Sequence, residues 1–253
     1  MLCFMSTASY SQEYVTAELV STIPLKAEQL IGLNNFGTLF YINGPNFYKI
    51  EPQQSFNYSN VQLGNITSAD AFNPLKITLF YKNFNTVLIL DNRLAEIYQF
   101  NFSIQQPYRN VTHVSAGNDT TLWIYNQDLQ QLELFDYKKN KTRANTMPVR
   151  SDILALVSTL NDAWLLTENH LYKYNYFGST LLKMKNQGFL NISENNGNLV
   201  VQTKDQLYYL AKNSEQLIPI HLPSLLIKQF LLTNESLYIY TDETLHQFQL
   251  KIN

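Results

Sequence analysis

A strand-and-turn pattern recurs along this chain with a period near 40 residues, and this repeat constrains the fold more than any other feature. Runs of β-branched, aliphatic and aromatic residues alternate with turns rich in Asn, Asp, Gly and Pro, as in antiparallel sheets. The turns are 40, 43, 41, 36 and 38 residues apart and lie near Gly44, Phe84, Gln127, Glu168, Lys204 and Asp242. The strands before them are Thr38–Ile42, Ile77–Tyr81, Thr121–Tyr125, Ala163–Thr167, Asn198–Gln202 and Ser236–Tyr240.

A second strand follows each turn, and each repeat also offers one strand before and one strand after this hairpin. About 40 residues thus supply four short antiparallel strands. Four such strands make one blade of a propeller. No segment with helical periodicity interrupts the repeats. The six units therefore predict an all-β fold, specifically a six-bladed β-propeller. A pair of two-sheet sandwiches is the alternative.

The two ends of the repeat array indicate how the ring closes. The last unit supplies only three strands, whereas the chain begins with a surplus strand-like segment, Tyr14–Ile23, which Pro24 ends. Joining this segment to the last unit completes the sixth blade and leaves no open array edge. We therefore expect an N-terminal strand that closes the last blade, an arrangement that a sandwich pair does not explain.

Composition excludes several classes of partner. Of the 253 residues, 45% are hydrophobic and only 15% charged, and the net charge is −2, so neither a nucleic acid nor an anionic membrane is indicated as a partner. No stretch approaches the roughly 18 apolar residues of a transmembrane helix. Asn occurs 28 times and Gly 8 times, so we expect Asn at many turn positions with positive φ.

The first residues resemble the end of an export signal. A short apolar stretch, Leu2–Met5, is followed by small residues and a plausible cleavage site after Ser11. We therefore expect residues 1–11 to be a truncated signal peptide and residues 12–253 a single propeller domain; a frayed N-terminus is the alternative. Cys3 is the only cysteine, so the mature chain would have none, which fits a bacterial periplasm or surface.

No motif for catalysis or for cofactor binding stands out. The four histidines (His113, His170, His221 and His246) lack metal-ligand spacing, although Asp70 and His113 both lie on predicted axial strands. We interpret them as polar channel lining. Nucleophile elbows, phosphate-binding loops and calcium loops are missing from the sequence. We therefore predict no catalytic residue, no metal and no cofactor. The basic run Lys138–Arg143 is interpreted as a solvated hairpin, with a contact to an acidic partner as the alternative.

One charged constellation is the candidate binding site of this charge-poor chain. Asn73 and Pro74 form a rigid loop after the first strand of the second unit, and Asp91 and Arg93 lie in a hairpin expected at the same end of that unit. The predicted partner-binding residues are Asp70, Asn73, Lys76, Asp91 and Arg93. Salt bridges and turn capping within the fold are the alternative roles.

The segment ADAFNPLKITLFYKNFNTVLILDNRLAEI, from Ala69 to Ile97, resembles a blade motif of exported β-propeller proteins from Gram-negative bacteria with a type IX secretion system. The match covers about 30 residues. The propeller that plugs the periplasmic mouth of the type IX outer-membrane translocon is expected to be in or near this family. The resemblance implies a non-enzymatic interaction module in the periplasm, associated with the outer membrane. Its partner would be the translocon barrel, and outside that complex we expect a monomer.

Two other classes of function stay open. A propeller-type hydrolase would need carboxylates or metal ligands that converge on the axis from several blades, and Asp70, Asn118, Asp119 and Glu194 are the available candidates. A carbohydrate-binding protein would need exposed aromatic platforms. Trp123 and Trp164, however, lie in second strands, where we expect them to pack between blades.

Overall fold

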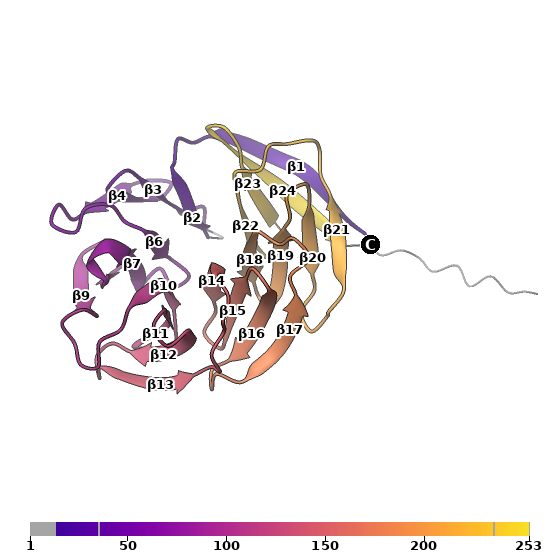
Figure 1. Cartoon of the computed structure of the whole chain (residues 1–253). Helices are drawn as coiled ribbons and strands as arrows, with labels where there is room; N and C mark the ends of the chain where they lie inside the picture. The colour runs from indigo at the N-terminus through magenta and orange to yellow at the C-terminus, as the bar shows by residue number, and fades with distance from the viewer. Residues whose placement is uncertain (1–13, 35, 235, 253) are drawn as a thin grey trace, which may run out of the picture.

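The computed structural model describes residues 14–34, 36–234 and 236–252. The described residues form 24 strands and one short 3₁₀ helix, η1 (Lys82–Phe84), so the prediction of an all-β fold is confirmed. Figure 1 shows the sheets arranged around a central axis. The predicted signal peptide, residues 1–11, lies outside the described residues.

Four sheets are separate meanders of four antiparallel strands. The first contains β2 (Gln29–Leu33), β3 (Leu39–Asn43), β4 (Asn46–Ile50) and β5 (Ser55–Ser59), and the second β6 (Ser68–Asp70), β7 (Ile77–Tyr81), β8 (Thr86–Leu90) and β9 (Glu96–Asn101). The third contains β10 (Val111–Ala116), β11 (Thr121–Asn126), β12 (Gln131–Asp136) and β13 (Lys141–Asn145). The fourth contains β14 (Ile153–Ser158), β15 (Asp162–Thr167), β16 (His170–Asn175) and β17 (Thr180–Lys185).

The remaining strands form one eight-stranded sheet in the order β18-β19-β20-β21-β1-β24-β23-β22. From the fifth repeat come β18 (Asn191–Asn195), β19 (Asn198–Gln202), β20 (Leu207–Leu210) and β21 (Leu217–His221). From the sixth come β22 (Gln229–Thr233), β23 (Ser236–Tyr240) and β24 (Thr244–Ile252), and β1 (Val15–Pro24) joins them. The sheet is nearly closed, because its two outermost strands, β18 and β22, contact each other.

The prediction of a six-bladed propeller is therefore wrong: four sheets stand alone, and the last two repeats share a single sheet. The cause lies at β1, which pairs antiparallel with β24 as the surplus N-terminal strand suggested. Its first two residues also pair in parallel with β21, Val15 with Ile220 and Thr16 with His221. Val15 is fully buried at this junction, so β1 joins two repeats that we expected to be separate blades.

Short side chains connect the innermost strands of neighbouring repeats. Asp70 on β6 accepts hydrogen bonds from β10, and the Ser158 hydroxyl on β14 donates to Ser115 on β10 at 2.8 Å. Ser193 on β18 accepts a 2.8 Å hydrogen bond from the backbone N–H of Leu232 on β22. These hydrogen bonds satisfy the Asp70 carboxylate and the serine hydroxyls and link neighbouring sheets through short side chains.

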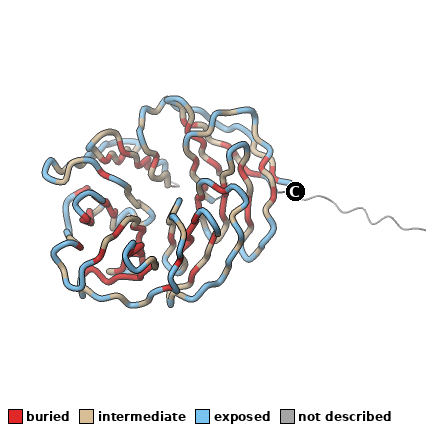
Figure 2. The backbone as a smooth tube through the Cα atoms, in the orientation of Figure 1, coloured by how far each residue is buried: buried red, intermediate tan, exposed pale blue. Residues whose placement is uncertain are grey.

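The apolar core lies between the faces of neighbouring repeats, where Figure 2 shows buried segments along the strands. Trp123 and Trp164 are 1% and 4% exposed and pack in two of these layers, as expected. Five layers contain eight or more buried apolar residues each. The layer between the sixth and first repeats contains only Leu30, Leu39, Tyr240 and Leu245.

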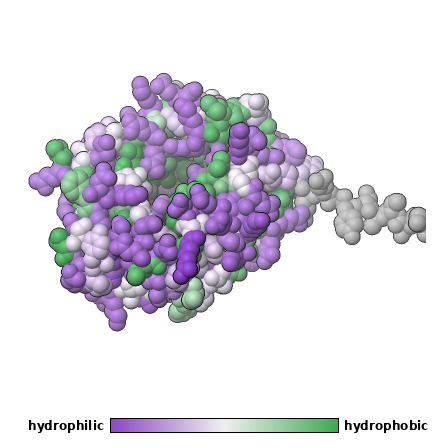
Figure 3. Space-filling view, in the orientation of Figure 1, coloured by the Kyte–Doolittle hydropathy of each residue, from purple (hydrophilic) through white to green (hydrophobic). Residues whose placement is uncertain are grey.

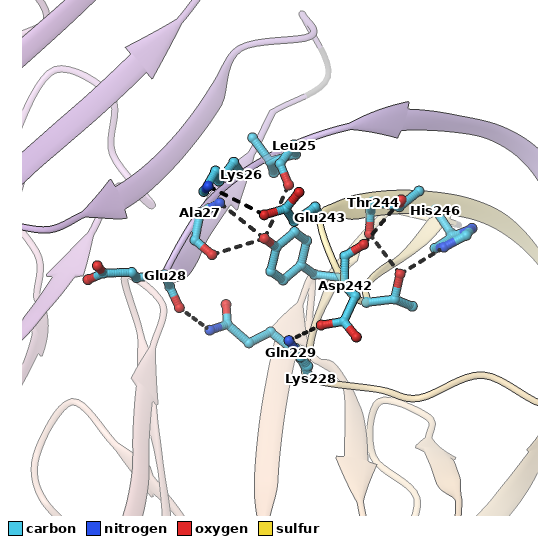
Figure 4. Close-up of polar contacts among 12 residues, drawn as sticks. Leu25, Lys26, Ala27, Glu28, Lys228, Gln229, Asp242, Glu243, Thr244 and His246 are labelled. Atoms are coloured by element: carbon cyan, nitrogen blue, oxygen red, sulfur yellow. Dashed lines mark hydrogen bonds and ion pairs between the residues drawn. The ribbon is translucent and has the colours of Figure 1, made fainter.

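Polar contacts supplement the smaller apolar layer at this last junction, which we call the seam (Figure 4). The Tyr240 hydroxyl accepts a 3.0 Å hydrogen bond from the N–H of Ala27 and lies 3.1 Å from the carbonyl oxygen of Leu25. The Gln229 amide accepts from the N–H of Leu30 and donates to the carbonyl of Glu28 at 3.0 Å. The seam is thus closed by directional bonds to the chain that links β1 to β2.

Candidate partner-binding face

The loops at one end of the ring form the face on which the predicted binding residues lie. In each antiparallel meander, the loop after the first strand and the loop after the third strand lie at the same end. We call this end the mouth face; its loops include residues 71–76, 91–95, 117–120, 159–161 and 176–179. The opposite end carries the loops between second and third strands and the connections between repeats.

Asp70 links two neighbouring sheets through hydrogen bonds. Its Oδ2 accepts 2.8 Å hydrogen bonds from the Ser115 hydroxyl and from the N–H of Ala116, and its Oδ1 accepts from the N–H of Phe72. Its carboxylate therefore has three donors inside the protein. We conclude that Asp70 positions the loop that follows it.

Lys76 ends the same loop and is half-buried against the next repeat. Its Nζ donates to the carbonyl oxygens of Gly117 at 3.0 Å and Asp119 at 2.7 Å. Burial lowers the pKa of Lys76, while the nearby carboxylates of Asp70 and Asp119 act in the opposite direction. The structure therefore brings Asp70 and Lys76 together, but both residues stabilise the contact between the second and third repeats.

Asn73 and Asp91 shape their own turns. Asn73 Oδ1 accepts from the N–H of Leu75, and Asp91 Oδ1 accepts from the N–H groups of Arg93 and Ala95. Such side-chain-to-backbone bonds are the usual role of Asn and Asp in turns. The Arg93 side chain is exposed and has no ion pair among the described residues. Of the five predicted residues, Arg93 is thus the one whose charge faces solvent.

Exposed apolar side chains on the mouth face were missed by the sequence reasoning. They come from four loops and comprise Phe36, Phe72, Leu75, Leu160 and Phe177. Phe36 is 84% and Phe177 78% exposed, far more than core residues of the same type. A signal was present for Phe36 and Phe177, which lie beside turn-forming residues in NNFG and YFGST.

A cavity of about 610 Å³ lies on the axis and is lined by all six innermost strands. Figure 3 shows hydrophobic residues within the hollow at the centre of the ring. Leu30, Ile31, Leu156 and Leu231 contribute apolar surface, and Asp70 and Glu194 are its two carboxylates. Burial raises the pKa of Glu194, whose Oε1 accepts a 2.6 Å hydrogen bond from the N–H of Gly197.

The axis lacks the cluster of ligands that a metal-dependent propeller hydrolase would need. No group of three or more His, Cys, Asp or Glu side chains able to hold a metal occurs within the described ranges. His113 does not line the cavity; its Nδ1 lies 3.0 Å from the Thr112 hydroxyl, and burial lowers its pKa to about 4. Asp70 and His113 therefore do not form a shared site.

The basic run forms the hairpin that the sequence suggested. Arg143 Nε donates to Oδ2 of the fully buried Asp136 at 3.0 Å, and the N–H groups of Lys138 and Lys139 cap the other carboxylate oxygen. The hairpin's charges are thus partly neutralised from within.

Comparison with known proteins connects the chain to propellers by fold alone. No protein-family model and no curated protein matches the sequence. A catalytically inactive virginiamycin B lyase from Staphylococcus aureus aligns with a TM-score of 0.63 and 9% identity, over 96% of this chain and 97% of that one. A chain of the mitotic checkpoint complex aligns with a TM-score of 0.58 and 10% identity, over 98% and 96% of the two chains.

A third similar structure is PorZ of Porphyromonas gingivalis, described as an essential bacterial surface component of the type IX secretion system. It aligns with a TM-score of 0.56 and 12% identity, over 87% of this chain but 32% of PorZ. Among the described residues, no helix is long and apolar enough to cross a membrane. These comparisons place the chain among proteins with the β-propeller fold.

Proposed function

We propose that this protein is a non-enzymatic interaction module that docks on a protein complex through its mouth face. The observation that carries the proposal is the set of apolar side chains, Phe36, Phe72 and Leu75, exposed on loops of the first two repeats. Large apolar side chains exposed on one face of a protein indicate a site of protein contact. Burying them against a partner would remove this apolar area from water.

The loop that presents Phe72 and Leu75 is held rigid by its own residues. Asp70 anchors its start, Lys76 anchors its end in the neighbouring repeat, and Pro74 restricts the backbone between them. A preorganised loop loses little conformational entropy on binding. The exposed guanidinium of Arg93 adds a positive group beside this loop.

More specifically, we propose that the chain is exported and that its partner is the outer-membrane barrel of a type IX translocon. The protein would contact or plug this barrel from the periplasmic side. The blade motif between Ala69 and Ile97 supports this proposal, and the fold likeness to PorZ agrees with it. The motif includes the rigid loop just described. Outside its complex the protein would be a monomer, and it would turn over no substrate.

Affinity purification from the native cell envelope tests this function. Phe72→Ser together with Leu75→Ser should abolish recovery of an outer-membrane barrel protein, identified by mass spectrometry. Leu226→Ser is the matched control, because Leu226 is 68% exposed in a connection at the opposite end. The control should keep full recovery. Equal recovery by a folded double variant would exclude this surface, and recovery of a different membrane complex would exclude the type IX assignment.

A further inference from the structure

The seam between the sixth and first repeats opens at the mouth face into a groove of about 810 Å³. One wall is the face of β23 and β24 that bears Ser236, Tyr238, Gln247 and Gln249. Tyr238 is paired with Gln247, and Ser236 with Gln249, so the four side chains form a compact array. The remaining lining comes from loops of the first, fifth and sixth repeats.

The groove is polar without being charged. Of the described residues that line it, none is charged and Leu33 is the single aliphatic side chain; the others are Asn34, Gly37, Asn196, Asn198, Thr233, Asn234, Ser236, Tyr238, Gln247 and Gln249. Elsewhere in the seam, Leu30, Leu39, Tyr240 and Leu245 pack between the sixth and first repeats. The groove is thus the part of this interface that apolar side chains do not fill.

Three of its amides are oriented by the protein so that they offer donors. The side-chain oxygen of Asn34 accepts from the N–H groups of Phe36 and Thr38, and that of Asn198 accepts from the N–H of Lys212 at 2.9 Å. The Gln247 Oε1 accepts from the Ser21 hydroxyl at 3.1 Å. Because each oxygen is already engaged, each NH₂ group remains to donate to a ligand.

Two loops that line the groove are also linked to each other. The amide of Asn196 donates to the side-chain oxygen of Asn234 at 2.8 Å, which links the loops of the fifth and sixth repeats. The half-buried ring of Tyr238 supplies the one aromatic surface among the lining residues. Burial raises the pKa of Tyr238, so its hydroxyl stays protonated at neutral pH and can donate or accept.

From this geometry we propose that the groove binds an uncharged oligosaccharide. Sugar hydroxyl and ring oxygens match the NH₂ donors of Asn34, Asn198 and Gln247, and the apolar face of a pyranose fits against the Tyr238 ring. An ionic ligand would find no countercharge among the described lining residues. Phe72 and Leu75 do not line this groove, whereas Phe36 of the docking set lies in the loop that supplies Asn34 and Gly37.

An extended peptide is a poorer fit to the same groove. Peptides that bind to sheets add a strand to a free edge, through backbone hydrogen bonds. Here β23 is paired on both sides with β22 and β24, and β24 is paired with β23 and β1. The wall therefore offers side chains but no free strand edge, and one aliphatic residue does not make the pockets that peptide side chains need.

Titration calorimetry with the full chain tests the proposal, using maltotriose, cellotriose, mannotriose and chitotriose as probes and an uncharged Gly-Ser hexapeptide for comparison. At least one trisaccharide should bind. Tyr238→Ala and Gln247→Ala should each weaken that binding about tenfold, as expected for the loss of a stacking surface or a hydrogen bond. Tyr108→Ala, a change of a tyrosine at another exposed site, should leave it unchanged.

Circular dichroism checks that each variant is folded. If Tyr238→Ala does not fold, the binding measured with Gln247→Ala tests the groove. Three results would overturn the proposal: no trisaccharide binds, binding survives in every folded groove variant, or the hexapeptide binds while the sugars do not.

Discussion

Asp70 and Ser115 are joined across two sheets by a 2.8 Å hydrogen bond from the serine hydroxyl to the aspartate Oδ2. The same oxygen accepts from the N–H of Ala116, and Ser158 extends the chain of contacts to β14. A single carboxylate therefore connects the second and third repeats, and through Ser115 the fourth, near the axis.

Asp70→Ala should accordingly destabilise the protein by roughly 1–3 kcal/mol, because it leaves buried donors without an acceptor. Urea unfolding followed by circular dichroism measures this. Asp205→Ala, an exposed carboxylate in a turn, is the control and should change stability by less than about 0.5 kcal/mol. Equal stabilities of the two variants would show that the Asp70 contacts contribute little.

Lys76 and Arg93 should separate stability from binding. Lys76→Glu removes two hydrogen bonds to the loop at Gly117–Asp119 and places a carboxylate beside Asp70 and Asp119, so we expect a loss of roughly 1–3 kcal/mol. Arg93→Glu should leave the thermal unfolding midpoint unchanged, because its charge faces solvent. A stable Lys76→Glu protein would mean that the hydrogen bonds of Lys76 to Gly117 and Asp119 are dispensable and that Lys76 is free to contact a partner.

Deletion of residues 12–25 should destabilise the eight-stranded sheet. β1 contributes nine residue pairs with β24 and two with β21. Its loss would leave the edges of β24 and β21 unpaired and would leave a cavity where Val15 is buried. Exposed strand edges also promote aggregation. Differential scanning calorimetry and light scattering should show a lower unfolding temperature and association on heating. An unchanged transition would contradict the closing role of β1.

Stability should fall as the pH drops from about 6.5 towards about 4, in part because of His113. Burial lowers the pKa of His113 from 6.5 to about 4, so the unfolded chain binds a proton in this range that the folded protein does not. Stability due to this group is therefore full above the unfolded pKa and lost as the pH falls. His113→Gln should flatten the urea-unfolding profile between these values; an unchanged slope would show that other groups cause it.

Strand positions were predictable because each run of β-formers ends at a turn residue. The predicted runs Ile77–Tyr81, Asn198–Gln202 and Ser236–Tyr240 coincide with β7, β19 and β23. Five of the nine described non-glycine residues with positive φ are Asn, as the composition suggested: Asn85, Asn140, Asn196, Asn213 and Asn234.

The division of the strands into sheets was not predictable. The parallel contact between β1 and β21 rests on two residue pairs, and a strand with one partner has the same side-chain alternation as a strand with two. The site was only partly predictable for a similar reason. Lys76 is held by two carbonyl oxygens 41 and 43 residues away, and backbone acceptors leave no mark in the sequence.

Docking through the mouth face is the central claim, and site-specific photo-crosslinking in the native cell tests it most directly. A benzophenone amino acid placed at Phe72 should crosslink to one envelope protein, and the same group placed at Leu226, on the opposite end, should not. Crosslinks from Leu226 alone, or from neither position in a folded and correctly localised protein, would contradict the account.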